Sequence, residues 1–371
     1  MNGPVSFLTG VTGLVGSELL QTLLDARPDR RVIVLTRDPR KIPPLGHGAR
    51  VIAAEGDITR PGLGLQPAML RQIRKEVTEI IHCAADTRFG LPLEQARATN
   101  TRGTAHLLKV ARGCTRLEKL AHLSTAYVAG RTTGHITEAP VREHAGFVNN
   151  YQQSKYEAEQ LVFETMREIP ISVYRLSTII GDSKTGRVRQ YNYFHQVLRL
   201  FARNVLPVAP GNLSWQEDLI ATDWCIAALA FAFESRFEPG EVLHICAGID
   251  GSPTIQEVKD TTLALFEQHP LLQKWLPIRP PAFVSLPEYE EYVRESLQSG
   301  DNLLIELLKL LGNFLPQMGI HQSFDDRKLR KKLEGSGIEL PPFSSYFGKV
   351  IAYCLDTDWG RKGGEALPGE R

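Results

Sequence analysis

The sequence predicts an α/β protein, with a doubly wound parallel sheet followed by a mostly helical C-terminal substrate-binding cap. Two observations carry this prediction. Short β-rich runs alternate with segments of helical periodicity through the first half of the chain, which is typical of a parallel sheet covered by helices on both faces. In addition, a glycine-rich turn stands between the first of these runs and the first helical segment.

Six short runs rich in Val, Ile and Leu are predicted as strands, at residues 5–9, 31–36, 51–55, 79–84, 119–124 and 171–176. Runs of this length and composition are typical of strands buried on both faces. Apolar residues recur at helical spacing between the runs, which predicts helices at 17–26, 69–75, 96–112 and 151–167. After Gly181 the pattern weakens, and we expect helices at 188–204 and 223–233 and a late strand at 241–246.

Three parts are predicted along the chain. Residues 1–250 form the sheet domain, with a substrate-side insertion around 182–222. Residues 251–360 are mostly helical and punctuated by prolines, which predicts a cap, and residues 361–371 are expected to form a frayed tail.

Two stretches of the cap have alternative interpretations. The apolar stretch 303–311 is either a core helix or a lipophilic face for an acyl chain or a membrane surface. The basic run 327–332 is either a solvated helix face or a dock for an acidic carrier protein or for phosphates.

Composition argues against several classes of protein. With 43 basic and 42 acidic residues, the chain lacks the basic excess of a protein that coats nucleic acid. Its five cysteines are scattered, which argues against a disulfide scaffold or a zinc ribbon. No run reaches the ~18 apolar residues of a membrane span. We therefore expect a cytoplasmic protein without metal, nucleic-acid partner or transmembrane span, and leave peripheral membrane contact and oligomeric state open.

The glycine-rich turn is the strongest single motif, with glycines at positions 10, 13 and 16. Gly10 allows the tight turn, Gly13 the close approach of a pyrophosphate to the backbone, and Gly16 the packing of helix on strand. The helix N-terminus adds free N–H groups and a partial positive charge for phosphate. In this context the turn predicts a Rossmann-like domain. Its dinucleotide-binding residues are expected to be Gly10, Thr12, Gly13, Leu14, Val15 and Gly16.

The ends of the next three strands supply further candidate cofactor residues. Arg37 follows the second strand, about 20 positions beyond the last glycine, where an arginine accommodates the 2′-phosphate of NADP. We therefore predict NADP, while a shifted alignment would place Asp38 on the ribose of NAD. The other candidates are Asp57 and Ile58 after the third strand, and the small Ala84 and Ala85 after the fourth. Asp57 has an alternative role as a turn residue.

Tyr151 and Lys155 lie four positions apart, on one face of the predicted helix 151–167. A free phenol has a pKa of ~10, so we expect the ammonium to stabilise the phenolate; a shift of ~3 units corresponds to about 4 kcal/mol. Such a tyrosine gives a proton to a developing alkoxide. Thr125, beside Ser124 at the end of the fifth strand, would hold the carbonyl oxygen against it. The pattern predicts hydride transfer from a nicotinamide.

Over residues 5–250 these features resemble an extended short-chain dehydrogenase/reductase. The motifs are Gly10-x-x-Gly13-x-x-Gly16, Asp57, His82-x-Ala84-Ala85, Asn100-x-x-Gly103-Thr104, Ser124-Thr125 and Tyr151-x-x-x-Lys155. Further segments are similar to the thioester reductase-like branch, which includes reductase domains of carboxylic acid reductases and nonribosomal peptide synthetases, and fatty acyl-CoA reductases. They are 123–128, 174–176 and 181–186. One departure is Leu176, where the branch usually has proline.

The resemblance implies a catalytic triad of Thr125, Tyr151 and Lys155, with Lys155 also on the nicotinamide ribose and Asn100 on the cofactor side. It further implies NADPH-dependent reduction of an acyl-CoA or acyl-carrier-protein thioester to an aldehyde, and in some members on to an alcohol. The alternatives are a ketone/alcohol oxidoreductase or nucleotide-sugar epimerase or dehydratase, and a non-catalytic NADP-binding scaffold. The last ranks low because both Tyr151 and Lys155 are present.

Overall fold

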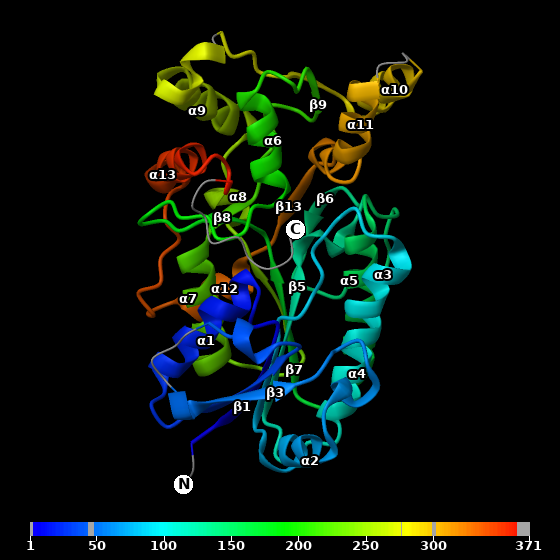
Figure 1. Ribbon diagram of the computed structural model, residues 1–371, viewed down its shortest axis with the longest axis vertical. Coiled ribbons are helices and arrows are strands. Elements are labelled where there is room, and N and C mark those ends of the chain that lie inside the picture. The colour runs from blue at the N-terminus through cyan, green and yellow to red at the C-terminus, as the bar shows by residue number, and fades with distance from the viewer. Residues whose placement is uncertain (1–2, 44–47, 276, 299–301, 362–371) are drawn as a thin grey trace.

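The computed structural model describes residues 3–43, 48–275, 277–298 and 302–361. In this part of the chain the centre is a seven-stranded sheet, parallel throughout, in the order β11-β7-β5-β4-β1-β2-β3 (Figure 1). The strands are β1 (Val5–Thr9), β2 (Arg31–Thr36), β3 (Val51–Glu55), β4 (Glu79–His82), β5 (Lys119–Thr125), β7 (Ile171–Leu176) and β11 (Val242–Ile245). The predicted doubly wound sheet is thus confirmed, and each predicted run falls on one of its strands.

Helices cover both faces of the sheet (Figure 1). One face carries α1 (Leu14–Ala26), α7 (Thr222–Ser235) and α12 (Arg327–Leu333), and the other carries α2 (Pro67–Glu76), α3 (Leu93–Thr99), α4 (Thr101–Ala111) and α5 (Asn150–Thr165). Val32 and Val34 of β2 belong to the core of the first face, whereas Ile33 and Leu35 belong to that of the second. Because successive side chains of a strand point to opposite faces, a fully apolar strand needs a helical layer on each side.

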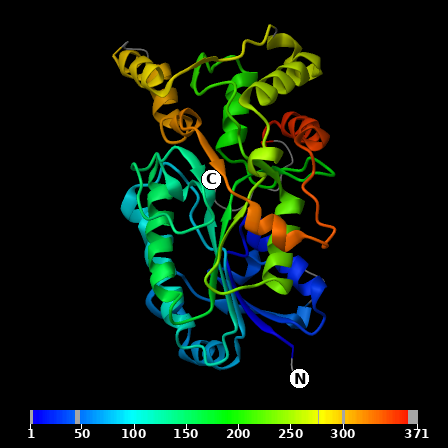
Figure 2. The ribbon, with the colours of Figure 1, turned by 180° about the vertical axis from the view of Figure 1, so that it is seen from behind.

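A second layer lies over the carboxyl ends of the strands (Figures 1 and 2). Its helices are α6 (Tyr193–Ala202), α8 (Gly248–Gly251), α9 (Ile255–Gln268), α10 (Leu286–Leu297), α11 (Asn302–Leu311) and α13 (Phe343–Asp356). Three parallel strand pairs support it: β10 (Leu219–Ala221) with β8 (Thr178–Gly181), β12 (Ala282–Val284) with β9 (Val208–Pro210), and β13 (Gln322–Phe324) with β6 (Gly134–Ile136). Single 3-10 turns are η1 (Pro39–Lys41), η2 (Gly48–Arg50), η3 (Pro61–Gly64), η4 (Ala126–Ala129), η5 (Pro270–Trp275) and η6 (Leu315–Gly319).

Two of these strand pairs join a strand before residue 250 to one after it, so both parts of the chain build the cap. The domain boundary at residue 250 stays a prediction. Of the predicted tail 361–371, residues 362–371 lie outside the described residues.

Two predicted helices differ from the observed ones. The segment 96–112 is divided into α3 and α4 at Asn100, whose side chain bonds to Asp86 and Ser154. The predicted helix 188–204 is shorter, because Asn192 caps α6: its side chain accepts a hydrogen bond from the Phe194 N–H at 3.1 Å. A side-chain acceptor at this position satisfies an N–H that has no partner inside the helix.

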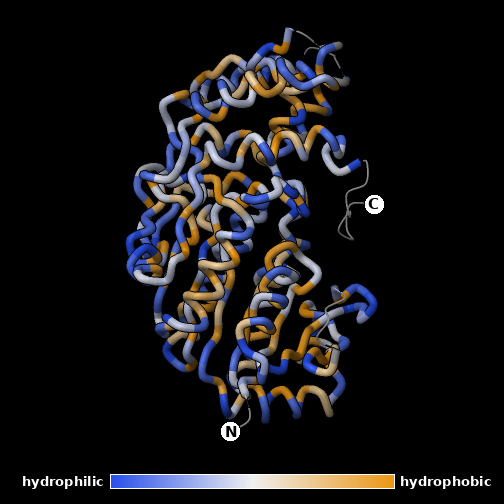
Figure 3. The backbone as a smooth tube through the Cα atoms, turned by 90° about the vertical axis from the view of Figure 1, so that its left-hand side faces the viewer, coloured by the Kyte–Doolittle hydropathy of each residue, from blue (hydrophilic) through white to orange (hydrophobic). Residues whose placement is uncertain are grey.

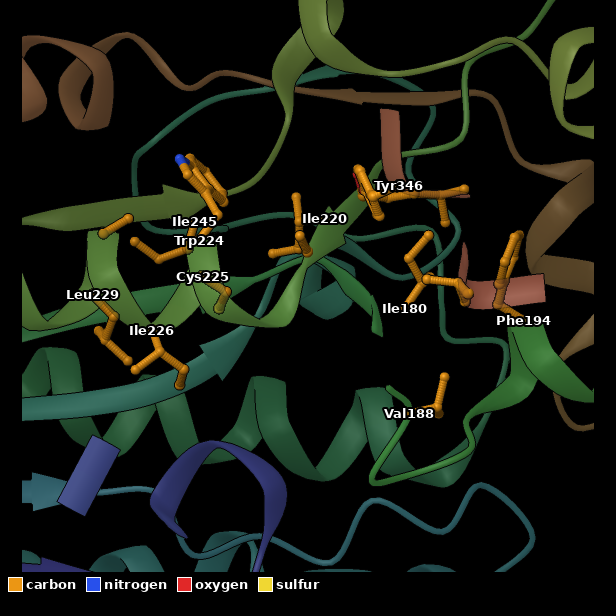
Figure 4. Packing of buried hydrophobic residues seen from close by; sticks show 14 of the residues in the cluster. Ile180, Val188, Phe194, Ile220, Trp224, Cys225, Ile226, Leu229, Ile245 and Tyr346 are labelled. Atoms are coloured by element: carbon orange, nitrogen blue, oxygen red, sulfur yellow. The ribbon is translucent and has the colours of Figure 1, made fainter. Parts of the chain in front are cut away.

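Helix α13, near the C-terminus, packs against residues of β8, β10 and α6. Tyr346 of α13 packs among Ile180, Ile220 and Phe194 (Figure 4), and its hydroxyl lies 3.4 Å from the Leu219 carbonyl. This core fixes the second layer over the sheet.

The basic run 327–332 is bound to acidic groups of the same chain. The Lys332 ammonium lies 2.8 Å from Glu241, and Arg330 pairs with Asp250 and Asp326. The Lys332 side chain is only 8% exposed. These contacts favour a structural role for the run over a docking role.

The apolar stretch 303–311 forms most of α11, where Leu308 and Leu311 are buried. Leu311 joins a small core with Phe314 and Tyr289, which favours the core-helix interpretation. Figure 3 shows hydrophobic segments gathered in the interior and hydrophilic ones along the loops. None of the helices in the described ranges is long and apolar enough to cross a membrane.

Candidate active site

The carboxyl ends of β1, β4 and β5 meet at one edge of the sheet, beneath the second layer (Figure 1). β1 pairs with β2 on one side and with β4 on the other, so the chain changes direction of winding between β1 and β4. Open α/β sheets bind their ligands at such a switch point. The predicted site residues follow these strand ends or lie on the helices beside them.

The three glycines of the turn after β1 differ in whether the structure has space for a side chain at their positions. Gly10 has a φ of +77°, and a Cβ there would lie 2.6 Å from the Ala84 nitrogen. A Cβ on Gly16 would lie 2.2 Å from the Gly10 carbonyl oxygen. A Cβ on Gly13 would meet nothing closer than 3.4 Å, and its φ of −86° suits any residue. Packing therefore explains why positions 10 and 16 are glycine. At Gly13, by contrast, there is open space where a side chain could lie.

This open space lies at the N-terminus of α1. Gly13 is the N-cap residue and provides no side-chain cap, and the first turn of the helix has no acidic residue. Thr12, Leu14 and Val15 are half-buried around it. Free N–H groups and the positive end of the helix dipole form an anion site. The residues present thus fit the pyrophosphate of a dinucleotide.

The end of β2 distinguishes the two candidate ribose residues. Asp38 accepts hydrogen bonds from the Arg40 guanidinium, two at 2.9 Å, and from the Arg40 N–H at 3.1 Å. These bonds hold the pKa of the Asp38 carboxyl below its usual value. Arg37 is exposed. Asp38 is therefore engaged by Arg40, whereas Arg37 makes no hydrogen bond or ion pair within the described ranges and is the candidate to meet a ligand.

Asp57 caps a turn: its carboxylate accepts hydrogen bonds from the Thr59 N–H at 2.9 Å and the Thr59 hydroxyl at 2.8 Å. Burial opposes its ionisation, but the Thr59 hydrogen bonds still hold the pKa of Asp57 below its ordinary value. Ile58 is buried, and Ala84 and Ala85 are half-buried after β4. Asp57 thus stabilises a turn. A cofactor could bind only to the acceptor positions of its carboxylate that Thr59 does not use.

Asn100 is 1% exposed, and its side-chain amide makes three hydrogen bonds within the protein. Its side-chain oxygen accepts from the Asp86 N–H at 2.8 Å, and its NH₂ donates to the Asp86 carbonyl at 3.0 Å and to the Ser154 hydroxyl at 2.9 Å. These three bonds fasten the loop after β4 to α5. The contact of Asn100 with a cofactor stays a prediction.

Thr125 and Tyr151 come together at the end of β5. Asn149 caps α5 by accepting the Gln152 N–H at 3.0 Å, which places Tyr151 in the first turn of that helix. The Thr125 hydroxyl accepts the Tyr127 N–H at 3.3 Å and lies close enough to the Tyr151 phenol to influence its pKa. The expected fall in the tyrosine pKa is absent: burial raises the pKa of Tyr151 to about 12, and the neighbouring Thr125 hydroxyl opposes the rise only in part.

Lys155 is 2% exposed, and its ammonium donates to the Leu123 carbonyl at 2.8 Å. Burial lowers its pKa to about 8, while the charge of Glu159 acts in the opposite direction. The ammonium is thus bound to the backbone of β5, and burial is what keeps the Tyr151 phenol protonated.

An aromatic wall formed by Phe89 and Tyr193 lies beside Tyr151 and could not be predicted from the sequence. The ring of Phe89 lies 5.5 Å from that of Tyr151 and 6.0 Å from that of Tyr193. The Tyr193 hydroxyl donates to Glu217 at 2.7 Å. Phe89 follows β4, Tyr193 opens α6 and Glu217 precedes β10, so only the fold brings these residues together. No local spacing in the sequence signals them.

A mostly apolar pocket continues from this wall, between α6, α9, β9 and β12. Tyr193 and Glu217 belong to its lining, together with Phe201, Val258 and Phe283. The arrangement joins three features: an anion site for a dinucleotide, a pair of hydroxyls beside a buried ammonium, and a pocket for an apolar group.

The glycine turn yields a test that separates packing from cofactor binding. We expect Gly13→Ala to keep its thermal stability but to lose most affinity for NADPH, because the new methyl group occupies only the space left for the pyrophosphate. Gly16→Ala should instead lower the melting temperature, since its Cβ meets the Gly10 carbonyl. Thermal unfolding and NADPH titration of both variants provide the measurement. Unchanged NADPH affinity in folded Gly13→Ala would contradict the assignment.

Comparison with known proteins agrees with this geometry. Residues 8–229 match the family described as Male sterility protein, an NAD-binding family. Isonitrile lipopeptide synthase of Streptomyces coeruleorubidus is 32% identical over 52% of this chain and 14% of its own length. Fatty acyl-CoA reductase wat of Drosophila melanogaster is 24% identical over 60% of this chain and 52% of its own length. The chain thus spans only part of these relatives.

Solved structures share the fold over nearly the whole chain. The terminal R domain from the myxalamid PKS-NRPS biosynthetic pathway has a TM-score of 0.76 at 23% identity, covering 97% of this chain and 92% of its own. DesIV, a dTDP-glucose 4,6-dehydratase from Streptomyces venezuelae with NAD and TYD bound, has a TM-score of 0.64 at 20% identity, covering 96% and 98%. The chain belongs to the Male sterility protein family, an NAD-binding family.

Proposed function

We propose that this chain uses NADPH to reduce an acyl thioester to an aldehyde, with Thr125, Tyr151 and Lys155 as the catalytic residues. The observation that carries the proposal is the Tyr151 phenol beside the Thr125 hydroxyl: it lies on the same helix as the buried Lys155 ammonium, and the rings of Phe89 and Tyr193 connect it to the apolar pocket. Such hydroxyls can hold a carbonyl oxygen, and the pocket suits the apolar part of an acyl group. The likeness to a fatty acyl-CoA reductase and to a terminal R domain supports the choice of a thioester.

The protonation states of the site suit reduction. Because the pKa of Tyr151 is about 12, the phenol is protonated at neutral pH and acts as a proton donor. Thr125 and Tyr151 donate hydrogen bonds to the thioester oxygen, and Tyr151 passes its proton to that oxygen as negative charge develops. Lys155 supplies the nearby positive charge that offsets the phenolate.

When bound, NADPH supplies the hydride to the thioester carbon. The protonated tetrahedral product then loses its thiol: the C–S bond breaks, the oxygen gives up its proton to sulfur, and an aldehyde remains. In a second step, the aldehyde would be held by the same two hydroxyls and reduced to an alcohol. The thiol that leaves belongs to coenzyme A or to a carrier protein, and a solved thiolation-reductase di-domain shares this fold at a TM-score of 0.71.

The same fold also serves nucleotide-sugar epimerases and dehydratases. A sugar carries many hydroxyl groups, each of which needs a hydrogen-bonding partner when buried. The pocket between α6 and α9 has mainly Phe, Leu, Val and Ile along its walls. This composition favours an acyl group over a sugar.

We expect Tyr151→Phe to reduce turnover of an acyl-CoA by ~10²–10⁴, which is the usual contribution of a general acid. Tyr156→Phe is the matched control, because Tyr156 lies on the same helix but packs on His144 and Phe147. NADPH oxidation at 340 nm measures both variants. Turnover by Tyr151→Phe close to that of the wild type would overturn the catalytic assignment.

Arg37 tests the proposed choice of NADPH over NADH. Hydrogen bonds to charged groups contribute about 1.5–3 kcal/mol, so Arg37→Ala should weaken NADPH binding by roughly 10- to 100-fold and leave NADH binding little changed. Arg40→Ala should have a much smaller effect, because Arg40 is paired with Asp38. Titration with each nucleotide gives the affinities. Equal losses for NADPH and NADH would show that Arg37 does not meet the 2′-phosphate.

A further inference from the structure

The pocket of the second layer is apolar apart from a few polar groups. Its walls come from α6, α9, β9 and β12 and from η6, and include Val197, Phe201, Ile255, Val258, Phe283 and Met318. Glu217, Lys259 and Thr262 also line it. A few placed polar groups in an apolar pocket fix the orientation of a ligand and its specificity, so these three residues indicate what the ligand carries.

Glu217 presents an acceptor to the pocket. One of its carboxyl oxygens accepts from the Tyr193 hydroxyl at 2.7 Å. Tyr193 is held in place by Thr178 and Tyr127, whose hydroxyl oxygens lie 3.0 Å and 3.2 Å from its own. Within the described ranges the structure gives the second carboxyl oxygen of Glu217 no hydrogen bond. The protein thus fixes the carboxyl group through one oxygen and leaves the other for a partner in the pocket.

Thr262 provides a second, independent sign of a ligand. It is fully buried on α9 and lines the same pocket, yet its hydroxyl has no hydrogen-bond partner among the described residues. Buried polar groups are nearly always hydrogen-bonded, and an unpaired one calls for an explanation. A polar group on a ligand would satisfy both Thr262 and Glu217.

The charges around Glu217 favour a cationic partner. Lys259 lines the pocket, but its ammonium lies 3.2 Å from the Asp260 carboxylate, which offsets its charge. Asp218, next to Glu217, is occupied by the Ser177 hydroxyl and the N–H groups of Ala247 and Gly248. Burial and the charge of Asp218 raise the pKa of Glu217 to about 7. A cation beside Glu217 would favour its ionised form, as opposite charges do.

Aromatic side chains connect the pocket to the proposed catalytic hydroxyls. Tyr193 lines the pocket, and its ring centre lies 6.0 Å from that of Phe89, which in turn lies 5.5 Å from that of Tyr151. A group bound against Glu217 is therefore linked along one aromatic wall to the position where the thioester carbonyl would lie.

We propose that this pocket selects acyl groups that carry an amine, whose ammonium group donates a hydrogen bond to the free carboxyl oxygen of Glu217. The inference rests on the proposed thioester reduction and names its substrate class: aminoacyl thioesters with an apolar chain between the amine and the carbonyl. Thr262 supplies a second hydrogen bond to the amine.

Matched coenzyme A thioesters test the inference. Each ω-amino acyl-CoA from five to ten carbons is paired with the acyl-CoA in which a methyl group replaces the amine. At one chain length or more, the wild type should show a kcat/KM for the amine about 10- to 100-fold above that for its partner, as expected for a charged hydrogen bond. Glu217→Gln should reduce this ratio by about the same factor. Glu257→Gln, at the exposed cap of α9, is the matched control and should leave the ratio unchanged.

The outcomes separate the two proposals. Reduction of the methyl-terminated esters with no preference for amines at any length overturns the inference and leaves thioester reduction standing. If no ester is reduced, the proposed function fails. Binding of the paired esters to the Tyr151→Phe variant, measured by calorimetry, then tests the pocket alone: tighter binding of the amine supports the inference, and equal affinities overturn it. The ratio of kcat/KM between amine and methyl esters is measured on the wild type, so this test holds even if Glu217→Gln does not fold.

Discussion

A buried ion pair between Glu159 and Arg175 holds the helix that carries Tyr151 and Lys155. The two side chains are fully buried and make two hydrogen bonds, of 2.9 Å and 2.7 Å. Arg175 also donates to the Ala139 carbonyl at 2.9 Å. Removing one partner of such a pair typically costs about 3–5 kcal/mol, because the other charge stays buried. An exposed pair such as Arg112 with Glu168 is typically worth at most ~1 kcal/mol.

This pair fixes the position of α5 along its axis relative to β5 and β7. Lys155 lies one turn before Glu159, and its ammonium reaches the Leu123 carbonyl only when α5 is seated in this way. The opposite end of α5 joins the second layer, because Asn149 donates to the Asn313 carbonyl at 3.0 Å and Gln152 to Gln317 at 2.7 Å. One helix thus fixes the reactive hydroxyl relative to the sheet below it and to the cap above it.

Much of the sheet could be predicted because its strands are short, apolar runs, and all except the edge strand β3 are buried on both faces. Four observed strands have the predicted bounds, namely β1, β2, β3 and β7. The glycine turn was also predictable, since the backbone of the turn gives Gly10 a φ of +77° and brings Gly16 against the Gly10 carbonyl. The break at Asn100 was not, because it depends on side-chain bonds to Asp86 and Ser154, which lie far along the chain.

The pKa of Tyr151 and the pocket residues were beyond sequence reasoning for a related reason. Spacing showed that Tyr151 and Lys155 share a helix face, but not that the ammonium is directed to a backbone carbonyl and that the phenol is buried. Phe89, Tyr193 and Glu217 lie on separate elements and meet only in the folded chain. A protonated Tyr151 nevertheless agrees with the proposed role as an acid in reduction.

The most direct test of the proposed chemistry is the stoichiometry of thiol release against NADPH oxidation with an acyl-CoA. The account predicts that one free thiol appears for each one or two NADPH consumed, one for an aldehyde product and two for an alcohol, and that no thiol appears without NADPH. NADPH consumption with the matching aldehyde but no thiol release from the thioester would contradict it, and would make the chain a carbonyl reductase.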